Sequence, residues 1–131
     1  KNTQPYPGVI ATLKKLNTKG ISMAVATNKR YVPTIKLINH FNWQEYFTSI
    51  ECSDSQSQIR NKDEMIQKIL KNSSFNKAFF VGDTVNDGLS ANLNQLPFIF
   101  ARFGYGRDQD WSNVTIKKTI NSFAELESIT I

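Results

Sequence analysis

Val81-Gly82-Asp83-Thr84-Val85-Asn86-Asp87 carries the strongest structural signal in this sequence. The apolar run Ala78–Val81 leads into it and is typical of a buried strand, and the pattern over Val85–Leu93 predicts a short helix after it. The glycine allows a sharp backbone turn where the strand ends. Asp83 at the strand end and Asp87 about one helical turn later can therefore converge on one point.

Two carboxylates at this spacing have two interpretations. Mg²⁺ prefers oxygen ligands, and it is commonly bound by a few protein carboxylates, with water and phosphate oxygens filling the rest of its coordination sphere. Alternatively, Asp83 only ends the strand and Asp87 only caps or decorates the helix that follows. The spacing alone leaves both interpretations open.

The rest of the chain alternates between the two kinds of secondary structure. Helices are predicted from Pro7 to a stop at Gly20, over Tyr31–Phe41, over Lys62–Lys71 and over Phe123–Ile129, and strands over Ile21–Ala26, Phe47–Cys52 and Leu96–Ala101. This alternation predicts an α/β fold, a three-layer Rossmann-like parallel sheet with helices on both faces. The length of 131 residues fits a single domain, residues 1–131.

Ligands of such sheets bind beyond the carboxyl ends of the strands. Besides the first stretch, those positions hold Asp54 and Thr27-Asn28-Lys29. The Thr27 hydroxyl and the backbone N–H groups around Asn28 can donate to a phosphoryl group. The alternative is that Thr27 caps the helix that begins near Tyr31.

Lys62 opens a predicted helix. A lysine there commonly faces solvent, and the helix dipole slightly disfavours its charge. In a phosphate site it would instead neutralise phosphate and hold a carboxylate nucleophile. Lys29 and Arg60 are alternatives for that role.

In this order, these elements resemble the haloacid dehalogenase-like (HAD) hydrolases, and more closely their phosphoglycolate-phosphatase-like branch. The resemblance rests on an apolar strand ending in Thr27-Asn28-Lys29, then Lys62, then Val81-Gly82-Asp83 with Asp87. It extends to Tyr6-Pro7-Gly8-Val9, Phe41–Phe47 and Phe103-Gly104-Tyr105-Gly106, and so covers nearly the whole chain.

The resemblance implies a role for each site residue. Thr27 and Asn28 would bind the transferring phosphoryl group, and Lys62 would bridge phosphate and nucleophile. Asp83 would bind Mg²⁺ directly, and Asp87 directly or through water. The implied activity is Mg²⁺-dependent hydrolysis of a small phosphorylated metabolite, similar to phosphoglycolate, through an aspartyl-phosphate.

The family's first motif, an Asp-x-Asp on the central strand, has no counterpart before Thr27, and neither has its cap domain. Asp108-Gln109-Asp110 follows a glycine turn instead of an apolar strand, which indicates a solvated loop. We therefore expect a partial core domain, truncated at the N-terminus and inactive by itself. The alternative is a non-catalytic binding or interaction domain that keeps the fold.

The amino-acid composition limits the kinds of molecule that this chain is expected to bind. A net charge of +5 and a pI near 9.4 fit a phosphorylated small molecule, whereas the basic residues form scattered pairs with no stripe suited to nucleic acid. No apolar run approaches the roughly 20 residues of a membrane span. The single cysteine excludes an internal disulfide. We expect a cytoplasmic protein that binds neither nucleic acid nor membrane.

The missing strand also has a structural consequence. In the resembling family it separates the strands that correspond here to Met23–Ala26 and Phe79–Val81, so their backbone groups would lack partners. The simplest prediction is that these two strands pair directly. Self-association through the exposed sheet edge is the alternative.

Overall fold

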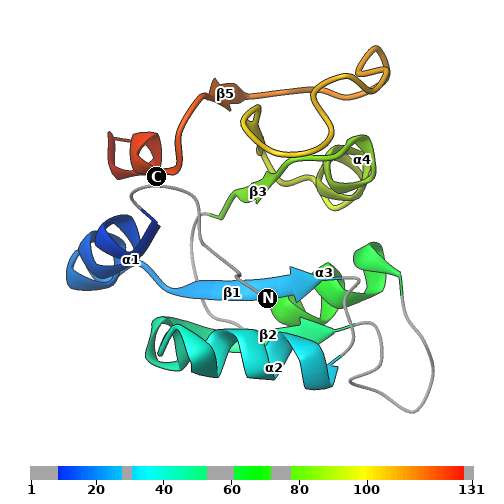
Figure 1. The fold of residues 1–131 in the computed structure, drawn as a ribbon. Helices are drawn as coiled ribbons and strands as arrows, with labels where there is room; N and C mark the ends of the chain where they lie inside the picture. Colours follow the sequence, from blue (N-terminus) through cyan, green and yellow to red (C-terminus); the bar gives the residue numbers. More distant parts are fainter. Residues whose placement is uncertain (1–8, 28–30, 53–60, 72–77, 129–131) are drawn as a thin grey trace. The chain divides into compact units, whose positions relative to one another are not determined.

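The computed structural model describes residues 9–27, 31–52, 61–71 and 78–128 (Figure 1). The chain divides into two compact units, each described here by itself. The first unit comprises Lys1–Lys19 together with Asn76–Ile131, and the second comprises Gly20–Phe75. No helix in the described parts is both long and apolar enough to cross a membrane.

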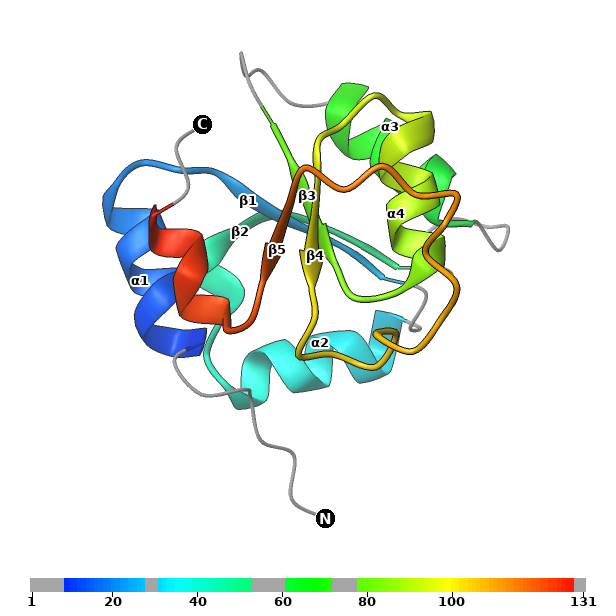
Figure 2. The ribbon, with the colours of Figure 1, turned by 90° about the horizontal axis from the view of Figure 1, so that it is seen from above.

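The second unit is built on two parallel strands, β1 (Met23–Thr27) and β2 (Phe47–Cys52). Helix α2 (Tyr31–His40) and the short 3-10 helix η1 (Gln44–Tyr46) connect them, and α3 (Lys62–Lys71) follows β2. Figure 2 shows α2 and α3 on opposite sides of this sheet. The unit therefore has the layered arrangement that the alternating sequence predicts.

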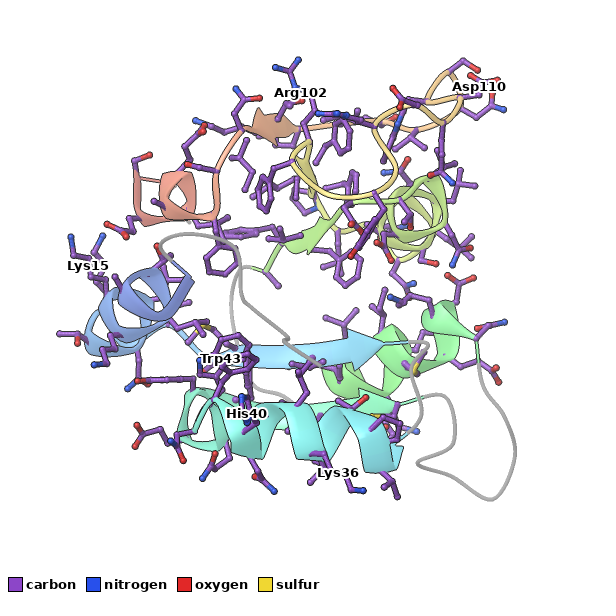
Figure 3. All side chains as sticks on the ribbon, in the orientation of Figure 1. Lys15, Lys36, His40, Trp43, Arg102 and Asp110 are labelled. Carbon is purple, nitrogen blue, oxygen red and sulfur yellow. The ribbon has the colours of Figure 1, made fainter. Side chains whose placement is uncertain are left out.

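Apolar side chains at helical spacing hold these layers together. In α3, Met65 is fully buried and Ile66 is 3% exposed, and α3 contacts both strands. Cys52, the last residue of β2, is also fully buried. The end of α2 carries an aromatic cluster in which Phe41 stacks on Trp43, with ring centroids 4.6 Å apart (Trp43 labelled in Figure 3).

The first unit contains a three-stranded parallel sheet in the order β3-β4-β5. In Figure 2, α4 lies on one side of this sheet, and α1 and the 3-10 helix η2 lie on the other. The elements are α1 (Val9–Thr18), β3 (Phe80–Gly82), α4 (Val85–Leu93), β4 (Phe98–Ala101), β5 (Lys118–Ile120) and η2 (Phe123–Ser128).

The core under α4 is aromatic. Phe98 and Phe100 from β4 pack against Ala91 of α4, with exposed fractions of 1%, 6% and 0%. Trp111, from the loop after β4, lies with its ring centroid 4.1 Å from that of Phe100. Rings of this size bury a large apolar area, so this cluster fixes α4 and the loop on the same sheet.

A polar clamp joins α1 to η2. The hydroxyl of Thr12, which is fully buried, donates to Glu127 Oε2 at 2.7 Å. Lys15 forms an ion pair with the other oxygen of Glu127 at 3.1 Å, and Lys19 donates to its backbone carbonyl at 2.9 Å. The hydrogen bond from Thr12, aided by Lys15, holds the pKa of Glu127 below its ordinary value. Elements more than 100 residues apart in the sequence are thereby fastened together.

Most predicted elements are confirmed, with small shifts at their ends. The predictions over Lys62–Lys71 and Val85–Leu93 coincide with α3 and α4. The predicted closing helix is confirmed over the described residues Phe123–Ser128, which form a 3-10 helix. Strand β5 was not predicted, because Lys118 and Thr119 are exposed and its three residues carry no apolar pattern.

Strands β1 and β3 belong to different units, and each pairs within its own, β1 with β2 and β3 with β4. The predicted direct pairing of Met23–Ala26 with Phe79–Val81 would join the two units, so it stays a prediction.

Candidate active site

The site begins at the turn between β3 and α4, where a capping box orders the backbone. Thr84 is the N-cap of α4, and its hydroxyl accepts the backbone N–H of Asp87 at 3.2 Å. In return, Asp87 Oδ2 accepts the N–H groups of Thr84 at 3.3 Å and of Asp83 at 3.2 Å. These bonds satisfy donors that a helix start leaves without partners. Asp87, only 8% exposed, is thus fixed in orientation.

Asp83 directly follows β3 and is held from a different loop. Its Oδ2 accepts the backbone N–H of Tyr105 at 3.0 Å, a contact between residues 22 positions apart. The structure therefore places Asp83 and Asp87 on one turn, where Asp87 Oδ2 accepts the Asp83 N–H. Convergence of the two carboxylates on one cation stays a prediction. The structure also supports the helix-capping interpretation of Asp87, because the capping box is complete.

Glycines make room for both carboxylates. A Cβ at Gly82 would lie 2.5 Å from Asp87 Cβ and 2.7 Å from its Oδ2, and a Cβ at Gly104 would overlap the Asp83 side chain. Contacts that short do not occur between real side chains, so a larger residue at either position would displace an acid. The glycines that the resemblance singled out thus have a steric explanation.

The loop after β4 closes over this turn. Gln109 Oε1 accepts the N–H of Val85 at 2.8 Å, and Trp111 Nε1 donates to Gly106 O at 2.8 Å. Neither Gln109 nor Trp111 was predicted to support the site. The only available signal was the position of Gln109 just after the glycine turn, which does not reveal a partner 24 residues away.

The other predicted residues lie in the second unit. Lys62 is 8% exposed, and its ammonium donates to Ala26 O at 3.1 Å, so it reaches the carboxyl end of β1. This contradicts the interpretation of Lys62 as a solvent-facing lysine. Thr27 is the last residue of β1, in register with Cys52 of β2. Thr27 and Lys62 thus both belong to the carboxyl end of this strand.

Several candidates fall outside the described residues, namely Asn28, Lys29, Asp54 and Arg60. The predicted solvated loop at Asp108-Gln109-Asp110 is confirmed, since all three residues are exposed and Asp110 lies at the outer part of the loop in Figure 3. Hydrogen bonds from Ser112 hold the pKa of Asp110 below its ordinary value. Asp110 is a charged, solvated acid.

The donor set at the turn fits magnesium in chemistry and only partly in number. A carboxylate offers two oxygens with about four acceptor sites, and the bond from Tyr105 takes one site on Asp83. Oxygen donors without nitrogen or sulfur favour a hard cation. Within the described residues, however, no group of three or more His, Cys, Asp or Glu side chains could hold a metal. Asp83 and Asp87 can therefore supply two ligands of an incomplete set.

The sequence profile of the haloacid dehalogenase-like hydrolases matches residues 1–101. This chain belongs to that family. It is 35% identical over 106 residues to a phosphoglycolate phosphatase of Agrobacterium fabrum, a match that covers 79% of this chain and 45% of the relative. It is 33% identical over 100 residues to a phosphoglycolate phosphatase of Rhodobacter capsulatus, covering 76% and 46%.

Solved structures agree with the family. The crystal structure of a predicted phosphatase from Clostridium acetobutylicum, 29% identical, matches with a TM-score of 0.83 over 93% of this chain and 57% of that chain. The predicted HAD-like fold is confirmed. The chain spans about half the length of the curated relatives it matches.

Proposed function

We propose that this chain forms the magnesium- and phosphate-binding part of a phosphatase that acts on small phosphomonoesters similar to phosphoglycolate. The observation that carries the proposal is the pair Asp83 and Asp87, two carboxylates oriented by backbone N–H groups on the turn after β3. Membership of the haloacid dehalogenase-like hydrolase family and the similarity to phosphoglycolate phosphatases support it.

Asp83 and Asp87 would hold the cation. When bound, Mg²⁺ withdraws charge from phosphoryl oxygens and helps to orient them. The chain's own residues position that charge. The backbone donors fix both carboxylates before any ligand arrives, so little reorganisation is needed on binding.

Lys62 and Thr27 would bind the phosphoryl group. The Lys62 ammonium has three donors, and the Ala26 carbonyl accepts one of them. Because Lys62 is nearly buried, its charge interacts more strongly with phosphate than a solvated lysine would. The Thr27 hydroxyl and the backbone at Asn28 would add neutral donors.

The proposed reaction passes through an aspartyl-phosphate. An aspartate oxygen attacks phosphorus, the ester P–O bond breaks, and the leaving alcohol takes a proton from a general acid; water then hydrolyses the acyl phosphate and releases inorganic phosphate. We assign no residue of 1–131 to the nucleophile, since Asp108 and Asp110 are exposed in a loop. We therefore propose that these 131 residues alone are inactive.

A second candidate function is phosphate-ligand binding without catalysis. It is favoured by the complete capping box, which accounts for Asp87 without any metal. Both functions predict that a phosphorylated ligand binds, and only the first predicts turnover.

The test compares phosphate release by the 131-residue chain and by the longest natural polypeptide that contains it, using 2-phosphoglycolate and an aryl phosphate. We expect no turnover from the chain, and turnover from the longer polypeptide that EDTA removes. Asp83→Asn should lower the rate by about 100-fold or more, the usual scale for loss of one electrostatic contact in a site. Asp108→Asn is the control and should retain the rate.

Two results would contradict the proposal. A longer polypeptide with full activity in Asp83→Asn would remove Asp83 from the site. A longer polypeptide that binds 2-phosphoglycolate but never hydrolyses any phosphomonoester would favour the non-catalytic function.

A further inference from the structure

The first N–H of α4 has a partner from outside the helix. Val85 is the first residue of α4, and its N–H donates to Gln109 Oε1 at 2.8 Å. The N-cap residue Thr84 uses its hydroxyl on Asp87 instead, at 3.2 Å. A helix start leaves such donors unpaired unless another group accepts them. Gln109 therefore attaches its loop to the same turn that carries the two acids.

The loop around Gln109 is held by hydrogen bonds within the loop. The backbone N–H of Gln109 donates to Gly106 O at 3.0 Å, and the indole N–H of Trp111 donates to the same oxygen at 2.8 Å. Trp111 packs on Phe100, whose exposed fraction is 6%. A Cβ at Gly106 would lie 2.7 Å from Gln109 Oε1 and 2.8 Å from Thr84 Cα, so backbone and amide approach closely. Gln109 and Trp111 therefore anchor this part of the loop to the start of α4 and to the aromatic core.

Tyr105 precedes these anchors in the same loop, next to Gly106, and its N–H donates to Asp83 Oδ2 at 3.0 Å. We infer that Gln109 is a positioning residue, which holds the Tyr105 N–H on Asp83 and so fixes the carboxylate that would bind the cation. The inference rests on the proposed function for its consequence, metal affinity. The attachment of the loop to the start of α4 rests on the hydrogen bonds alone.

An uncharged amide suits this position. Gln109 accepts the Val85 N–H without adding a negative charge beside Asp83 and Asp87, so it does not compete with them for a cation. Gln109 is exposed, so its replacement opens no cavity in the core. A change in Asp83 should follow from the loss of the brace alone.

The experiment compares Gln109→Leu, which removes the acceptor, with Gln109→Glu, which keeps an oxygen. Asp108→Asn, an exposed neighbour, is the matched control. Amide hydrogen exchange of the metal-free 131-residue chain is measured by NMR. We expect Gln109→Leu to accelerate exchange at Val85 and at Tyr105 by about tenfold or more, a loss of about 1.4 kcal/mol of protection. Exchange in the buried strand β4 should not change.

Titration with Mn²⁺, a paramagnetic substitute for Mg²⁺, gives the second readout. Loss of an outer-shell partner commonly costs about 10–100-fold in metal affinity, and we expect Gln109→Leu to weaken Mn²⁺ binding by about tenfold. Gln109→Glu should restore slow exchange at both amides.

The possible outcomes test the role of Gln109 and the proposed metal site separately. Faster exchange at Val85 with unchanged exchange at Tyr105 would reduce Gln109 to a helix cap and overturn the inference. Faster exchange at both with unaltered Mn²⁺ affinity would overturn it as well. No Mn²⁺ binding by the unaltered chain would instead defeat the proposed metal site, and linked exchange of the two amides would still support the brace.

Discussion

Asp87 has a structural role as well as a proposed role in metal binding, and two substitutions separate them. Asp87→Ala removes the acceptor for the N–H groups of Asp83 and Thr84, at 3.2 and 3.3 Å. Asp87→Asn keeps an oxygen in the same place but loses the charge. If the capping box is mainly structural, the alanine variant should lose much more stability. If the charge serves a cation, both variants should lose metal affinity.

The size of the effect follows from the burial of this turn. Replacing a capping residue by alanine costs about 0.5–2 kcal/mol, and leaving a buried N–H without a partner costs about 1–3 kcal/mol. The two bonds, at 3.2 and 3.3 Å, lie at and just beyond the long end of the usual range, so the lower halves of these intervals apply. We expect Asp87→Ala to lower the free energy of unfolding of the first unit by about 2 kcal/mol. Asp87→Asn should lower it by about 1 kcal/mol or less.

Urea unfolding measures this, with one tryptophan as the reporter. The sequence has two tryptophans, Trp43 in the second unit and Trp111 in the first. In a Trp43→Phe background, the fluorescence of Trp111 reports the unit that contains Asp87. With a slope of about 1–2 kcal/mol per molar urea, Asp87→Ala should move the midpoint by about 1–2 M.

The exposed neighbour Asn86 supplies the control, since Asn86→Ala should change the free energy of unfolding by less than about 0.5 kcal/mol. Equal loss of stability in Asp87→Ala and Asp87→Asn would show that the charge, rather than the oxygen acceptor, stabilises the turn. Retention of full Mn²⁺ affinity by Asp87→Asn would remove Asp87 from the metal site.

Two further predictions concern packing and pH. Because the pKa of Glu127 is lowered, its contacts with Thr12 and Lys15 contribute their full stability above the ordinary carboxyl pKa and lose it as pH falls toward the lowered value. Glu127→Gln should therefore reduce the fall of the urea midpoint on the acid side. If the midpoint falls as steeply with pH in Glu127→Gln as in the exposed control Glu45→Gln, this prediction is refuted. A Cβ at Gly88 would lie 2.5 Å from Val114 Cγ1. Gly88→Ala should therefore lower the free energy of unfolding by about 1–3 kcal/mol despite the better helix propensity of alanine, and adding Val114→Ala should recover about half of that loss. A Gly88→Ala variant as stable as the original would contradict this packing.

The sequence predicted what is local. The limits of α3 and α4 follow from apolar periodicity. Strand β5 was not predictable in this way, because two of its three residues are exposed and only its ladder with β4 defines it. The pairing predicted for β1 and β3 would join the two units, and strand pairing depends on a whole sheet, so two strand edges read from the sequence cannot decide it.

The same distinction explains why the acids of the site were found and their supports were not. Asp83 and Asp87 stand four positions apart, and the glycine before them is read from the same stretch. The Tyr105 N–H is supplied by the backbone, and any residue except proline at that position carries the same donor. A backbone donor leaves no trace in the residue type. The sequence can, however, show where a side chain has been excluded to let such a donor approach. Gly104 is such a position, because a side chain there would overlap Asp83. Glycines beside an acidic motif are therefore the places to look for backbone groups that orient the acids.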